Sequence, residues 1–171
     1  QIISTTDRPG SRTPKVARQC AQIADHLMIH TNIFGMHELP SGSYEGSVYG
    51  QPNEILSKVL HKHIVPADRI QLVLPEYNGS FPGVFKHFID LSPPDIWKVK
   101  KIALIGVATG RSGNIRGIDH ITGVLHYLKA EVLSNKVYLS QVHLHSDEHG
   151  NIINREYLNL IEKQITDLST F

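Results

Sequence analysis

Apolar and polar residues follow one another along this chain in two repeating patterns. Short continuous apolar runs are typical of buried strands, whereas apolar residues spaced three and four positions apart are typical of helices. The run Ile102–Val107 is apolar throughout, as expected for a strand covered on both faces. These patterns predict five strands, at Ile2-Ile3, near Met28–Phe34, at Ile70–Leu74, at Ile102–Val107 and near Val132–Leu139.

Five segments with helical spacing alternate with these strands. Thr13 and Pro14 suit the N-cap and the first position of the first helix, and Ser92-Pro93-Pro94 ends the third helix. The helices are predicted at Pro14–Leu27, Pro52–His63, Pro82–Leu91, Arg116–Lys129 and Asn154–Leu168, with a loop over Leu39–Gln51.

This alternation predicts an α/β fold, a three-layer sandwich in which helices cover both faces of a parallel sheet joined by right-handed crossovers. The strand order expected is 2-1-3-4-5. A length of 171 residues suits a single domain over positions 1–171 with a sizeable core. In this order strands one, three and four are neighbours, so the loops after them form one rim. Ligands of open α/β sheets bind at that edge.

The loop after the third strand has the most informative composition. Residues Pro75–Gly83 include two glycines, two prolines, an amide, a phenol and a hydroxyl, with one charge. Such a loop offers backbone N–H groups at close range to a flat polar ligand. It therefore indicates a binding site.

The loops after the first and fourth strands supply groups that bind anions. The loop Ser4–Thr13 carries hydroxyls, Arg8 and Arg12, and it opens a helix, whose dipole and free N–H groups attract anions. It lacks the glycine spacing of triphosphate and dinucleotide loops, which favours a single terminal monophosphate. The loop Ala108–Gly117 has three glycines within eight residues that permit close backbone approach. Taken singly, the first loop also fits a polar turn with an N-cap, and the last fits a mobile surface loop.

Composition and charge argue against several classes of function. Hydrophobic residues make up 40% and charged residues 19%, with a formal net charge of +1, as in ordinary globular proteins. This balance argues against a nucleic-acid binder with a broad basic surface, and weakly against an acidic electron carrier steered to basic partners. No apolar run is long enough to span a bilayer, so no membrane association is expected. Cys20, the only cysteine, falls on the apolar side of a helix, where burial is expected. Without an internal disulfide, a cytoplasmic location is expected.

Several histidines and aromatic residues have structural and functional interpretations. On a strand, His143 and His145 would share one face and form a metal pair. We favour solvated loop histidines on the side away from the three loops, and we predict no metal site. Trp97 is expected to pack in the core. Tyr44 and Tyr49 are expected to cover the site or an interface.

The motif of the third loop is similar to the signature of a known family. Pro75-Glu76-Tyr77-Asn78-Gly79-Ser80, followed by Pro82-Gly83-Val84-Phe85-Lys86 and Ile89-Asp90, resembles that of the NADPH-dependent FMN reductases. These are flavodoxin-like proteins that include quinone, azo-dye and chromate reductases. The loop Ser4–Thr13 resembles the family's phosphate loop, and Gly110–Gly117 resembles its third flavin contact. The resemblance covers at least Ile3 to about Leu139.

The resemblance implies a flavodoxin-like fold that binds FMN at the three loops. It implies phosphate contacts at Thr6, Arg8, Ser11 and Thr13, isoalloxazine contacts at Pro75, Glu76, Tyr77, Asn78, Gly79 and Ser80, and a further edge at Thr109, Gly110, Arg111, Gly113 and Asn114. The flavin carries the chemistry in such enzymes. It takes hydride from NADPH or NADH and reduces a small acceptor such as a quinone, an azo compound or free flavin. No catalytic side chain is then required. A homodimer or homotetramer through the helices after strands three and four is also implied.

Two other functions stay open. A flavodoxin-like electron carrier has this fold without a nicotinamide site, and an interaction or regulatory protein binds FMN weakly. Thr5, where the family commonly has Gly, and Asp7, where a neutral residue is usual, favour the second. A carboxylate repels a phosphate dianion unless it points away or pairs with Arg8 or Arg12.

Overall fold

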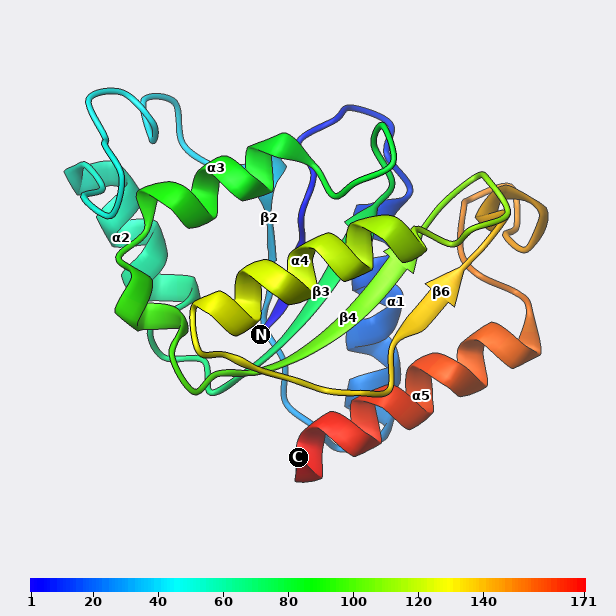
Figure 1. The fold of residues 1–171 in the computed structure, drawn as a ribbon. Coiled ribbons are helices and arrows are strands. Elements are labelled where there is room, and N and C mark those ends of the chain that lie inside the picture. The colour runs from blue at the N-terminus through cyan, green and yellow to red at the C-terminus, as the bar shows by residue number, and fades with distance from the viewer.

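The computed structural model describes residues 1–171 as alternating strands and helices (Figure 1). The strands are β1 (Ile2–Ser4), β2 (Ile33–Gly35), β3 (Arg69–Pro75), β4 (Lys101–Val107), β5 (Glu131–Val132) and β6 (Val137–Leu139). The helices are α1 (Thr13–His26), α2 (Glu54–His63), α3 (Gly83–Leu91), α4 (Ile115–Tyr127) and α5 (Arg155–Thr170). Three 3₁₀ helices are η1 (Met36–Glu38), η2 (Pro94–Trp97) and η3 (Val142–Leu144). None of the helices is long and apolar enough to cross a membrane.

The strands form one parallel sheet in the order β2-β1-β3-β4-β5, with β6 also paired to β4. This confirms the predicted order 2-1-3-4-5 and the flavodoxin-like fold class. The central pair is in register from Arg69 opposite Lys101 to Pro75 opposite Val107. The carboxyl ends of β1, β3 and β4 therefore lie side by side, at the top of the molecule in Figure 1.

Two apolar clusters fill the interfaces between the three layers. One face of the sheet packs Leu72 and Leu104 against α2, α3 and α4, and the other packs Val73 and Ile105 against α1 and α5. Neighbouring strand residues point to opposite faces, so the continuous apolar runs of β3 and β4 fill both clusters. Trp97 is fully buried against Phe85 and Phe88, as predicted.

The predicted helix ends lie within two residues of the observed ones, but the predicted N-cap is wrong. Thr13 is the first residue of α1, and Arg12 occupies the N-cap position without a side-chain cap. The hydroxyl of Ser11 accepts the N–H of Thr13 at 3.3 Å instead. The loop therefore supplies its own hydrogen-bond acceptor two residues earlier than the pattern indicated.

Two of the predicted strands are also wrong in extent. Met28 has a φ of 60° and is exposed, so the second strand begins only at Ile33. The predicted fifth strand is split into β5 and β6, and the segment between them turns toward α5. There the carbonyl of Asn135 accepts a hydrogen bond from Gln164 at 2.8 Å. A helix side chain thus replaces the neighbouring strand as the partner of this backbone.

Candidate functional site

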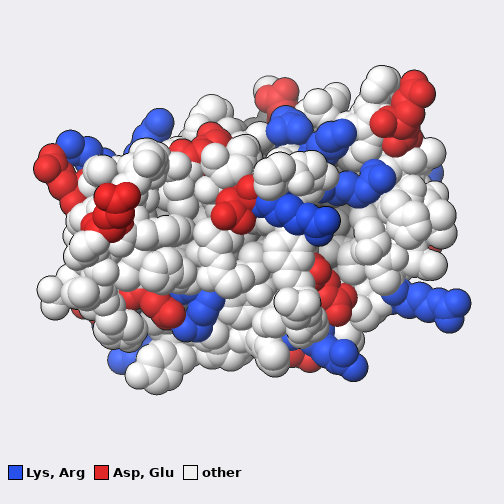
Figure 2. All heavy atoms as spheres, turned by 90° about the horizontal axis from the view of Figure 1, so that it is seen from above, with Lys and Arg blue, Asp and Glu red and all other residues white.

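A cavity of about 190 Å³ opens at the carboxyl edge of the sheet. It lies where the loops after β1, β3 and β4 meet, as the strand order predicted. Its lining is Arg8, Gly10, Ser11, Arg12, Thr13, Pro75, Glu76, Tyr77, Val107, Ala108, Thr109 and Val142. Figure 2 looks onto this edge and shows basic side chains gathered near the middle of the face, with acidic ones around them.

The β1–α1 loop presents free hydrogen-bond donors to this cavity. Gly10 has a φ of 72°, a conformation that glycine adopts without strain, and it turns the chain toward α1. The Ser11 hydroxyl donates to Thr13 Oγ1 at 3.1 Å. The N–H groups of Gly10 and Arg12 donate to no protein acceptor. Because α1 starts here, these donors and the helix dipole favour an anion.

The two residues that depart from the family pattern both turn away from the cavity. Thr5 is fully buried, and its hydroxyl donates to the Val73 carbonyl at 3.0 Å. Asp7 lines a separate cavity of about 400 Å³, together with Tyr44 and Val84. Burial and, second, the charge of Asp7 raise the pKa of Tyr44 to about 12. The expected repulsion between Asp7 and a bound phosphate is therefore weakened by its orientation.

A hydrogen-bonded group ties the first loop to the third. Thr6 is fully buried, and its hydroxyl lies 2.7 Å from the hydroxyl of Tyr77. The backbone N–H of Arg8 donates to Thr6 Oγ1 at 3.2 Å, and the Arg8 guanidinium lies 5.9 Å from the centre of the Tyr77 ring. Arg8 and Tyr77 line the cavity, but Thr6 lies behind them.

The third loop ends β3 in a tight turn. The backbones of Tyr77 and Ser80 exchange hydrogen bonds of 2.8 and 3.0 Å, and Asn78 and Gly79 between them have φ values of 51° and 74°. Two positive φ values define a type I′ turn, for which Asn-Gly is the preferred pair. The structure places Asn78, Gly79 and Ser80 beyond the lining, with Ser80 Oγ 2.9 Å from His120 Nδ1.

The β4–α4 loop contributes one end to the cavity and buries the other. Thr109 is in the lining, and Gly110 and Arg111 follow it as exposed residues. Gly113 packs on Tyr138, and Asn114 is fully buried.

Two polar contacts hold this loop against β3 and its loop. The Asn114 Nδ2 group donates to the carbonyl of Leu74 at 3.0 Å. Glu76, in the cavity lining, accepts the Ser112 hydroxyl at 2.6 Å. Asn114 therefore joins the β4–α4 loop to β3, and Glu76 joins the loop after β3 to the β4–α4 loop.

Val142 reaches the cavity from the segment that follows β6. That segment was expected on the far side of the molecule, which is wrong for its first residues. The Val142 N–H donates to the Ala108 carbonyl at 3.0 Å. Because β6 pairs with β4 up to Leu139, the chain leaves the sheet beside the β4 loop. No local sequence signal identifies this position.

The histidines of the same segment do not lie on a strand, so the strand interpretation is wrong. His143 is part of the 3₁₀ helix η3. The ring of His145 lies 5.0 Å from that of Tyr157, and its Nδ1 is 3.1 Å from Asn154 Nδ2. His145 therefore packs against the start of α5.

The donors of the cavity fit the phosphate group of FMN. Arg8 and Arg12 supply two positive charges, and Ser11, Thr13 and Tyr77 supply hydroxyls. The volume of the cavity is below the roughly 300–1,000 Å³ of pockets that enclose a whole cofactor-sized ligand.

Fold and site together define a flavodoxin-like protein with a cavity lined by two arginines and several hydroxyls at the topological switch point of the sheet. The chain has this fold in common with the flavoenzyme FerB, an NAD(P)H:(acceptor) oxidoreductase from Paracoccus denitrificans. The TM-score is 0.72 at 19% identity, over 98% of this chain and 96% of FerB.

Two sequence comparisons identify the family. Residues 1–144 match the model of the NADPH-dependent FMN reductases. The chain is 30% identical to a quinone reductase of Escherichia coli K12 over 172 residues, 96% of this chain and 89% of that enzyme. The chain therefore belongs to the NADPH-dependent FMN reductase family, whose members are oxidoreductases.

One further relative is matched over a shorter stretch. The chain is 32% identical to a 2-hydroxy-1,4-benzoquinone reductase of Burkholderia sp. over 111 residues. The match spans 60% of this chain and 61% of that enzyme, less than two thirds of its length.

Proposed function

We propose that residues 1–171 act as a single FMN-binding domain that oxidises NADPH or NADH and reduces a small acceptor. The observation that carries this proposal is the cavity between Arg8, Arg12 and Tyr77. Its charged and hydroxyl hydrogen-bond donors suit a phosphate, and they lie beside a rim suited to a flat ring. FMN, when bound, supplies the chemistry by taking up hydride from the nicotinamide and passing the electrons on. The acceptor classes are quinones, azo compounds and free flavins.

The chain's own residues bind FMN and orient it. Arg8, Arg12, Ser11 and Thr13 hold the phosphate by charge-assisted hydrogen bonds. The turn Pro75–Ser80 carries backbone N–H groups along one edge of the ring, and Thr109 to Arg111 border another.

A cavity of about 190 Å³ is too small to enclose the whole flavin, so we expect the outer face of the ring to stay accessible. Flat acceptors of varied substitution therefore fit better than one closely enclosed substrate. The quinone reductases among the relatives support this acceptor class. Use of NAD(P)H supports the predicted cytoplasmic location.

A homodimer or homotetramer forms part of the proposal. A cavity of about 520 Å³ between α3 and α4 is bordered by Tyr49 and Tyr127, whose side chains are strongly exposed. Aromatic residues are enriched at protein interfaces. These are the helices that the resemblance implied.

The test is a spectroscopic titration of the purified chain. We expect FMN to bind with a perturbed visible spectrum. NADPH or NADH should then bleach it without oxygen, and benzoquinone should restore it. Failure to bind FMN would exclude the enzyme. Binding without bleaching by either nicotinamide would identify an electron carrier.

A further inference from the structure

The hydrogen bond between Thr6 and Tyr77 has a direction that the surrounding structure determines. Thr6 Oγ1 is fully buried and has two polar neighbours, the Arg8 N–H at 3.2 Å and the Tyr77 hydroxyl at 2.7 Å. The Arg8 N–H is a donor, so it uses one lone pair of Thr6 Oγ1. The hydroxyl proton of Thr6 therefore has a single acceptor within reach, the Tyr77 oxygen.

The opposite direction would leave a buried donor without an acceptor. If Tyr77 donated to Thr6, the Thr6 proton would have no partner inside the protein, which is costly for a buried hydroxyl. Tyr77 is only half-buried and lines the cavity, so its own proton can point into that space. The order of donation is Arg8 N–H to Thr6, and Thr6 to Tyr77. The Tyr77 proton is then left for a ligand.

We propose that the Tyr77 hydroxyl donates to a phosphate oxygen of the bound mononucleotide, and that Thr6 is a positioning residue that does not itself touch the ligand. This rests on the proposed function for the ligand's identity. Arg8 and Arg12 line the same cavity, so the acceptor that Tyr77 meets there is anionic. A donor whose orientation is set by a buried chain needs no rearrangement when the anion binds.

The assignment changes the expected roles of both residues. The family resemblance implied that Thr6 contacts the phosphate and that Tyr77 borders the ring. In the structure, Thr6 lies behind Tyr77, and the Tyr77 hydroxyl faces the phosphate loop.

The experiment compares the affinities of FMN and riboflavin, which differ by the phosphate, for the full chain and its variants. Tyr77→Phe should weaken FMN binding by about ten- to a hundredfold, the range for a hydrogen bond to a charged group. Riboflavin binding should stay within about twofold. Thr6→Val should weaken FMN by a smaller factor, about three- to tenfold, and Thr6→Ser should restore it. Tyr44→Phe is the control, because its hydroxyl donates to the Val84 carbonyl outside the cavity.

The outcomes distinguish failure of the Tyr77 assignment from failure of the proposed function. Equal weakening of FMN and riboflavin by Tyr77→Phe, or no weakening of either, overturns the assignment. The same conclusion follows if Thr6→Ser fails to restore what Thr6→Val removes. Circular dichroism establishes that each variant is folded, and the Thr6 pair decides the matter if Tyr77→Phe does not fold. If the wild type binds neither flavin, the proposed function falls. The role of Tyr77 is then tested with inorganic phosphate, whose binding is followed by ³¹P line broadening. Tighter binding to the wild type than to Tyr77→Phe supports the assignment, and equal binding overturns it.

Discussion

At the scale of single residues, the orientation of a charge matters more than its place in the sequence. Asp7 and Arg8 are adjacent, yet they line different cavities. The β1–α1 loop therefore presents Arg8 to one cavity and Asp7 to another. Asp7 is therefore compatible with an anion bound at Arg8, because the two adjacent side chains point in different directions.

This predicts unequal effects of removing the two kinds of charge. Asp7→Asn should change FMN affinity by less than about twofold, because its carboxylate lies outside the phosphate cavity and solvent screens it. Arg12→Gln should weaken FMN by about tenfold or more, through loss of a charge-assisted contact. Fluorescence titration at fixed ionic strength measures both. A large gain in affinity on Asp7→Asn would show that the carboxylate repels the phosphate.

His63 makes the stability of the fold sensitive to acid. Its ring stacks on Phe34 at 4.3 Å, and burial, with a smaller contribution from Lys62, lowers its pKa below the reference value of 6.5. A base whose pKa is lowered by folding binds a proton more readily when unfolded, so stability falls as the pH drops below about 6.5. His63→Gln should show a smaller fall in the free energy of unfolding between about pH 7.5 and 5.5. Urea denaturation measures this difference, and identical falls in both proteins would contradict it.

At the scale of elements, most helices and the two central strands could be predicted, because their signals are local. The continuous apolar runs of β3 and β4 and the spacing of α2 were sufficient. The short edge strands were not predictable in extent. Their ends depend on partners distant in the sequence, such as Gln164 for the segment between β5 and β6.

The junction of β4 with the β4–α4 loop requires glycine at one position. A Cβ at Gly106 would overlap the carbonyl oxygen of Gly113, whereas nothing lies near a Cβ at Gly123 in α4. Gly106→Ala should lower the free energy of unfolding by about 1–3 kcal/mol or more. Gly123→Ala should raise it by about 0.5–1 kcal/mol through helix propensity. Thermal and urea unfolding measure the stability of both variants. Similar changes in the free energy of unfolding at the two positions would contradict the close contact between Gly106 and Gly113.

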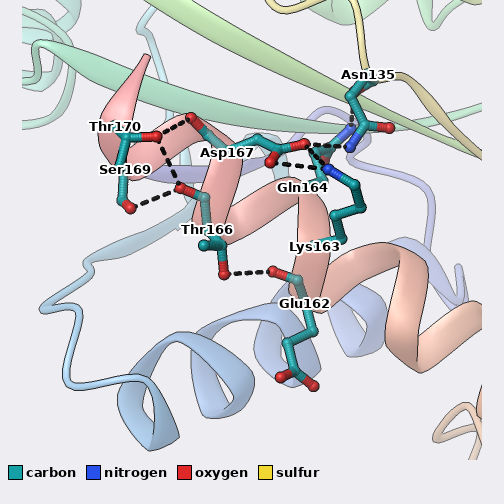
Figure 3. A network of polar contacts seen from close by, with 8 residues as sticks. All are labelled: Asn135, Glu162, Lys163, Gln164, Thr166, Asp167, Ser169 and Thr170. Carbon is teal, nitrogen blue, oxygen red and sulfur yellow. Dashed lines mark hydrogen bonds and ion pairs between the residues drawn. The ribbon is translucent and has the colours of Figure 1, made fainter.

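At the scale of the whole molecule, a buried polar group joins the sheet to its C-terminal helix. Gln164 of α5 accepts Gln71 Nε2 at 3.0 Å and donates to the carbonyls of Leu104 and Asn135 at 2.9 and 2.8 Å. Asn135 also donates to Asp167 at 2.7 Å, so two successive turns of α5 contact it (Figure 3). These contacts connect β3, β4 and the β5–β6 segment.

Loss of this group should destabilise the entire fold. Gln164→Leu leaves several buried groups without partners, each costing roughly 1–3 kcal/mol, so we expect a loss of at least about 2 kcal/mol in the free energy of unfolding. Thr166→Ala, at an exposed position of the same helix, should change it by less than about 0.5 kcal/mol. Urea unfolding of the two variants distinguishes a buried network from a general effect of changing α5.

The proposed association through α3 and α4 makes its own prediction. Tyr127 is 82% exposed in the single chain, and Tyr127→Asp should shift an oligomer toward monomer by placing a charge in an apolar contact. Met28→Asp, on another exposed apolar residue, is the control. Sedimentation velocity gives the masses. A monomeric wild type would contradict the proposal.

The sequence by itself determined the alternation of strands and helices, their order in the sheet and the three loops that meet at its edge. These features follow from local periodicity, turn residues and the handedness of crossovers. Only the tertiary structure decided which way the loop side chains point. It turned Thr5 and Asn114 inward and brought Val142 to the cavity. Thr6 and Tyr77 lie 71 positions apart, so their hydrogen bond arises from the packing of β1 beside β3 and has no local sequence signal.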